Sequence, residues 1–121
     1  THSLIKDIQP SHCLHLAWYT EPGKYWSSPE NLPWTASSIS LLHSFQQQGG
    51  TRFVGAGTCA EYDWRYGHCS EAVTPLEPAT LYGTCKNVLQ KTLAAFSEST
   101  SLSSAIMKEL AKKVLESTII H

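Results

Sequence analysis

Apolar residues in the first half of the chain follow first a strand-like and then a helix-like pattern. Residues 12–18 form a short, partly alternating apolar run after Pro10, which is typical of a buried strand. From 34 to 48 apolar residues recur at three-residue steps, and two glycines follow, which predicts a helix with one apolar stripe. Residues 52–57 are again apolar and end in small side chains. Strand, helix and strand in about forty residues indicate a βαβ unit with a parallel sheet.

The second half of the chain predicts two further helices. Apolar residues line one side of a helix from about 79 to 96. A serine-rich break follows, and residues 104–119 repeat Ile, Leu and Val at helical spacing, with lysines facing away. We therefore expect an α/β fold: a partial Rossmann-like parallel sheet, made of the βαβ unit and its following helix, with an extra C-terminal amphipathic helix.

Composition excludes several classes of function. The 121 residues carry a formal net charge of −1, so no basic surface for nucleic acid or an anionic membrane is expected. No apolar run is long enough to span a bilayer, and a cytoplasmic location is the simplest expectation. The four cysteines and six histidines show no paired metal-binding spacing. We expect no metal site and reduced thiols.

Tyr82 and Lys86 are the candidate pair for chemistry, because a spacing of four residues places both on one helix face. The pKa of a free tyrosine is near 10. For acid/base chemistry near neutral pH it must fall by roughly three, which corresponds to about 4 kcal/mol of stabilisation of the phenolate. A neighbouring ammonium favours the phenolate and supplies part of it. Thr58 ends the second predicted strand, where open parallel sheets place their active sites. A purely structural role is the alternative for each residue: a half-buried tyrosine beside a solvated lysine, and a threonine whose hydroxyl forms a hydrogen bond with the local backbone.

Three segments resemble the extended short-chain dehydrogenases of the NAD-dependent epimerase/dehydratase family. Residues 53–62 read F-V-G-A-G-T-C-A-E-Y, similar to the family strand that ends in a catalytic Ser or Thr four residues before a tyrosine. Residues 74–86 read T-P-L-E-P-A-T-L-Y-G-T-C-K and resemble the signature T-P-x-x-P-x-x-x-Y-G-x-x-K. Residues 15–17, His-Leu-Ala, are similar to the fourth strand of the family, whose end lines the cofactor.

The resemblance implies a role for each matching residue. Thr58 would position the substrate oxygen and Tyr82 would be the acid/base. Lys86 would tune Tyr82 and bind the nicotinamide ribose of NAD or NADP. The cofactor would also lie along three residues that follow one another at the end of the first strand: Leu16, Ala17 and Trp18.

The resemblance also implies a sugar-nucleotide substrate and narrows the chemistry. Sugar 4,6-dehydratases of the family carry an Asp-Glu pair directly after the threonine, whereas Cys59-Ala60 stand here. Epimerase or reductase chemistry is therefore favoured over dehydration. The structural alternative for Cys59 and Ala60 is that these small residues simply pack under the site.

The chain also departs from the family pattern. No Gly-rich pyrophosphate-binding turn precedes the first strand. The expected strand after the Tyr82 helix is replaced by the predicted tail helix, and the asparagine expected before the threonine strand reads Trp34 or Thr35. We therefore divide the chain into a partial domain, 1–98, and a break with a C-terminal helix, 99–121. Three explanations of these departures stay open: the chain is a fragment, a truncated gene whose tail comes from another reading frame, or a subunit that completes its fold with another chain. Each predicts weak or no binding of NAD by the isolated chain.

Two functions remain open. The first is an NAD(P)-dependent epimerase or reductase that works as part of a complete protein. The second is a non-catalytic interaction module, suggested by the absent glycine turn and by surplus amphipathic helices. By resemblance, the helices 34–48 and 79–96 would pair with their copies, so we expect a homodimer or larger assembly, which sedimentation would measure.

Overall fold

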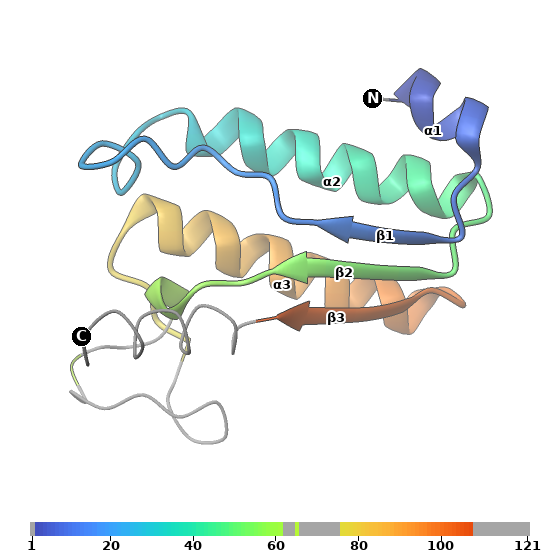
Figure 1. Cartoon of the computed structure of the whole chain (residues 1–121). Coiled ribbons are helices and arrows are strands. Elements are labelled where there is room, and N and C mark those ends of the chain that lie inside the picture. Colours follow the sequence, from blue (N-terminus) through green and yellow to red (C-terminus); the bar gives the residue numbers. More distant parts are fainter. Residues whose placement is uncertain (1, 62–64, 66–75, 108–121) are drawn as a thin grey trace, which may run out of the picture.

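The computed structural model contains one parallel sheet with helices packed against it (Figure 1). It describes residues 2–61, 65 and 76–107. The elements are, in chain order, α1 (His2–Ile8), β1 (His12–His15), α2 (Asn31–Gln47), β2 (Arg52–Ala56), the short helix η1 (Cys59–Glu61), α3 (Leu81–Ser99) and β3 (Ser103–Met107). The predicted α/β class and partial Rossmann-like sheet are confirmed.

All three strands run in the same direction, in the order β1-β2-β3. His12 of β1 pairs with Arg52 of β2, which in turn pairs with Ser103 of β3. In Figure 1 the three arrows point to the same edge of the sheet. Each of the two crossovers contains a helix, as the βαβ pattern predicted. The segments that follow β1 and β2 therefore begin at one common edge.

The hydrophobic core lies between the sheet and the two long helices. Five buried side chains from α2, the sheet, α3 and the α3–β3 connection form it: Leu42, Phe45, Phe53, Leu93 and Leu102. Cys13 of β1 packs against this cluster, and burial raises the pKa of its thiol. Leu14, the next residue along the strand, points to the other face and is 60% exposed. The apolar stripes predicted from the sequence thus cover one face of the sheet.

Local chemistry sets the ends of α2 and α3. Gly49 follows α2 with a φ of 88°, the left-handed conformation that glycine adopts without strain. Thr80 is the N-cap of α3: its backbone is extended, and its hydroxyl oxygen accepts a hydrogen bond from the Gly83 N–H at 3.0 Å. Both boundaries lie within three residues of those expected from the sequence.

The predicted C-terminal helix is wrong at its start. Residues 103–107 form β3, which pairs with β2 along its whole length. The edge of β2 offers five residues of parallel pairing, and this tertiary contact overrides a helical spacing that is weak over so short a run. The strand expected after the Tyr82 helix is therefore present. Residues 108–121, the rest of that predicted helix, lie outside the described residues, and for them the proposed division of the chain stays a prediction.

Within the part of the chain that the structure describes, no helix has the length and hydropathy that a membrane crossing requires.

Candidate active site

The candidate site lies at the carboxyl edge of the sheet, where the segments after β1 and β2 and the first turn of α3 lie at the same end of the fold (Figure 1). Thr58 follows β2 by two residues, Trp18 follows β1 by three, and Tyr82 is the second residue of α3. Parallel sheets bind their ligands in this position, outside the carboxyl ends of the strands.

The turn after β2 holds Thr58 by its backbone and by its side chain. The Thr58 N–H donates to Oε1 of Glu61 at 2.8 Å, and the Ala60 N–H donates to Oγ1 of Thr58 at 3.2 Å. A hydroxyl has one proton to donate and can accept two hydrogen bonds. The Ala60 contact uses one acceptor position, so the Thr58 hydroxyl keeps its proton to donate to another oxygen.

The first turn of α3 packs directly on this turn. A Cβ atom at Gly83 would overlap the carbonyl oxygen of Ala60 and crowd Pro78, so only glycine permits the approach. Gly83 is next to Tyr82, and Ala60 is two residues after Thr58. The packing therefore brings the backbone that carries Tyr82 against the backbone that carries Thr58.

Two aromatic residues of the β1–α2 connection enclose the Tyr82 ring, which is 9% exposed. The ring centroid of Tyr25 lies 4.8 Å from that of Tyr82, and the Trp26 centroid lies 5.7 Å away, both with nearly perpendicular planes. The Tyr82 N–H also donates to the carbonyl oxygen of Trp26 at 3.1 Å. Edge-to-face packing of this kind orients a ring as well as burying it.

Lys86 is also buried, with 7% of its surface exposed. Its Nζ lies 4.6 Å from the ring centroid of Trp18, a cation–π contact between α3 and the segment after β1. Burial lowers the pKa of Lys86, while the negative charge of Glu61 raises it. The structure thus brings two of the predicted cofactor-contacting residues, Trp18 and Lys86, into direct contact.

Asn31 is a residue of this region that sequence reasoning missed. It is fully buried at the first position of α2, where its Oδ1 accepts a hydrogen bond from Nε1 of Trp18 at 2.9 Å. Its amide nitrogen donates to the carbonyl oxygens of Tyr25, at 2.7 Å, and Ser28, at 2.9 Å. Asn31 therefore ties the loop that carries Trp18 and Tyr25 to α2.

The sequence predicted that α2 begins at Trp34, and by resemblance the place of the family asparagine reads Trp34 or Thr35, which stays a prediction. The helix begins three residues earlier, at Asn31 itself. The signal in the sequence was Pro33, since proline is favoured in the first turn of a helix.

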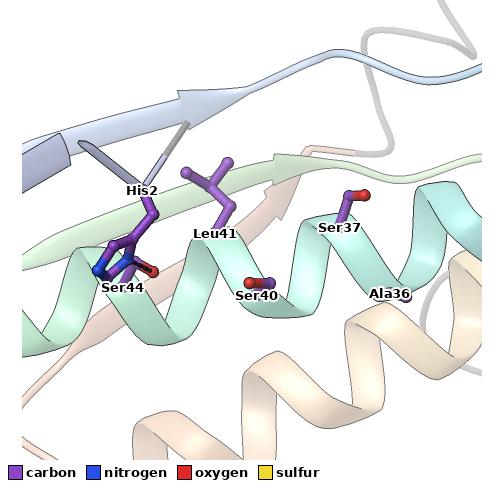
Figure 2. Close-up of a pocket in the computed structure, with 6 residues that line it drawn as sticks. All are labelled: His2, Ala36, Ser37, Ser40, Leu41 and Ser44. Carbon is purple, nitrogen blue, oxygen red and sulfur yellow. Dashed lines mark hydrogen bonds between the residues drawn. The ribbon is translucent and has the colours of Figure 1, made fainter. Parts of the chain in front are cut away.

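Two further findings concern metal ions and pockets. Among the described residues no group of three or more His, Cys, Asp or Glu side chains could hold a metal ion. A hollow of about 380 Å³ lies elsewhere, between α1 and α2 (Figure 2), and is lined by His2, Ala36, Ser37, Ser40, Leu41 and Ser44. It contains none of the residues expected to act in catalysis or cofactor binding.

The comparison with known proteins identifies the family. The family model described as "NAD dependent epimerase/dehydratase family" matches residues 1–109. The chain belongs to this family. No curated protein matches the chain.

Solved structures of epimerase/dehydratase enzymes share the fold of this family member. The UDP-Glc/GlcNAc 4-epimerase of Campylobacter jejuni is 22% identical, with a TM-score of 0.77. The Bordetella bronchiseptica enzyme WbmG, solved in complex with NAD and UDP, is 18% identical, with a TM-score of 0.71. Each match covers 88% of this chain and 33% of the other, so the chain spans about a third of the length of these relatives.

Proposed function

We propose that this chain supplies the proton-transfer residues of an NAD(P)-dependent epimerase or reductase that acts on a sugar nucleotide. The observation that carries the proposal is the packing of α3 on the turn after β2, with Tyr82 and Lys86 both buried at that contact. The NAD and UDP bound by a structural neighbour support the classes of cofactor and substrate.

The proposed chemistry follows from the three side chains. The Thr58 hydroxyl donates a hydrogen bond to the reacting oxygen of the sugar and so places it beside the Tyr82 phenol. Tyr82 then takes or returns the proton of that oxygen. The Lys86 ammonium, one helical turn away, favours the phenolate. A nicotinamide cofactor, when bound, would supply hydride exchange at the sugar carbon that bears this oxygen.

The residues after β1 fit one part of the cofactor, the nicotinamide ribose. Leu16 and Ala17 are exposed at the end of β1 and offer an apolar contact surface. The Lys86 ammonium, which contacts the Trp18 ring in the same segment, can donate to ribose hydroxyls. These residues fit NAD and NADP equally, because the two cofactors are identical at this end.

Binding of nicotinamide mononucleotide tests the proposal on the chain itself, since this compound contains only the cofactor half that these residues would contact. We expect nicotinamide mononucleotide to shift the backbone NMR signals of Leu16, Ala17 and Thr58, with millimolar or weaker affinity. Adenosine monophosphate, the other half of NAD, serves as the matched control and should leave these signals unchanged.

Two results would contradict the proposed cofactor site: no shift with either nucleotide, or shifts confined to the opposite edge of the sheet, around Gly49 and Gly50. Equal shifts with both nucleotides would indicate unspecific phosphate binding and would count against the proposal too.

Epimerase or reductase chemistry remains favoured over dehydration. The carboxylate nearest in sequence after Thr58 belongs to Glu61, which is fully buried and hydrogen-bonded to the Thr58 backbone. It is therefore not placed to remove a proton from an oxidised sugar. The homodimer, a complementing chain and the non-catalytic interaction module stay predictions.

A further inference from the structure

Glu61 is a buried acidic residue for which the proposed proton transfer gives no role. None of its surface is exposed, and it ends η1, three residues after Thr58. Carboxylates are rarely buried without compensation, because removing a charge from water is costly. One compensation is the hydrogen bond from the Thr58 N–H to Oε1 at 2.8 Å. A charge-assisted bond of this kind is stronger than one between neutral groups.

A second compensation comes from Lys86. Lys86 lies on α3, which packs against η1, and both Lys86 and Glu61 are buried. Burial lowers the pKa of Lys86, and the charge of Glu61 raises it. His15 of β1 is a further titratable group that the charge of Lys86 affects. Burial, and then the charge of Lys86, lower the pKa of His15, which keeps this imidazole neutral near neutral pH. Its Nε2 lies 2.9 Å from Oγ of Ser38. Among the described residues, Glu61 is therefore the acidic group whose charge favours the buried ammonium, which the Trp18 ring also contacts.

We infer that Glu61 is a positioning residue: its carboxylate fixes the backbone of Thr58 and is the counter-charge that keeps the buried Lys86 ammonium charged. It does not touch the reacting atoms, since it has no exposed surface. The inference rests on the proposed function for its meaning in catalysis. The hydrogen bond to Thr58 and the charge interaction with Lys86, however, are properties of the folded chain and can be measured without cofactor or substrate.

Two variants separate these two interactions. Glu61→Gln keeps an oxygen that can accept from the Thr58 N–H but removes the charge. We expect Lys86, followed by NMR of its labelled side chain, to titrate at lower pH in this variant than in the wild type. Glu61→Ala removes both interactions, so exchange of the Thr58 amide hydrogen should also become about tenfold faster or more. Glu77→Gln removes an exposed carboxylate paired with Arg65 and should change neither signal.

The inference is overturned if Lys86 titrates at the same pH in Glu61→Gln as in the wild type, or if Thr58 exchange is unchanged in Glu61→Ala. If Glu61→Gln lowers the urea midpoint too far for titration, the double variant Glu61→Gln/Lys86→Met replaces it. A charge pair predicts that Glu61→Gln costs less stability in the Lys86→Met background than alone, and additive losses would overturn it. Failure of nicotinamide mononucleotide binding with these outcomes intact would refute the cofactor site alone.

Discussion

Replacing Phe45 by alanine is expected to lower the free energy of unfolding by about 3–5 kcal/mol. The Phe45 side chain is completely buried, and its ring centroid lies 5.8 Å from that of Phe53 in an edge-to-face arrangement. The ring also fills the space where a side chain at Gly50 would lie. Its removal leaves a cavity between α2 and β2 that the neighbouring backbone closes only in part.

Urea denaturation of the chain, followed by circular dichroism, measures this effect. Leu32→Ala is the control, because Leu32 lies on α2 as well but is exposed, and it should change the free energy by less than about 0.5 kcal/mol. Domains of this size are stable by about 5–15 kcal/mol, so Phe45→Ala is also expected to unfold far more easily on heating. Similar losses in both variants would show that the core lies elsewhere.

Replacing Tyr82 by phenylalanine is expected to lower turnover of a sugar nucleotide by about 10²- to 10⁴-fold. Phenylalanine keeps the ring that packs against Tyr25 and Trp26, but it has no hydroxyl proton to exchange with the substrate. Stability should therefore change little while chemistry is lost. Turnover is to be measured on a longer protein that contains this chain and binds the cofactor.

Tyr19→Phe is the matched control for this loss. The Tyr19 hydroxyl donates to Oε2 of Glu21 at 2.8 Å in an exposed part of the loop, so its removal should leave turnover unchanged. A Tyr82→Phe protein that folds normally and keeps more than about a tenth of the wild-type turnover would contradict an acid/base role.

The sequence predicted the elements that depend on local patterns. Residues 52–56 are a strand, and the helices around Phe45 and Leu93 exist, because each carries apolar residues that face one side. Residues 12–15 are also a strand, but the prediction that it is buried was wrong, since Leu14 is 60% exposed on the face opposite the core. The strand at 103–107 could not be predicted in this way. Its Ser-Ser-Ala-Ile-Met run is too short for a clear period, and its conformation depends on pairing with β2.

The candidate site likewise has features that the sequence predicted and features that it could not predict. The order and spacing of Thr58, Tyr82 and Lys86 could be predicted from the sequence, since two of them lie four residues apart on one helix and the third closely follows a strand. The contacts of Lys86 with Trp18 and of Trp18 with Asn31 join different elements, so no local pattern reveals them. Burial of Glu61 also depends on the packing of α3 against η1.

The central claim is that Tyr82 and Lys86 act as one proton-transfer unit. It is tested most directly by NMR titration of the labelled Tyr82 ring in the wild type and in Lys86→Gln, with Lys91→Gln on the exposed side of α3 as control. We predict that the Tyr82 phenol loses its proton at higher pH in Lys86→Gln, because the ammonium that favours phenolate is gone, and that Lys91→Gln matches the wild type. The same Tyr82 titration in all three proteins would contradict the claim.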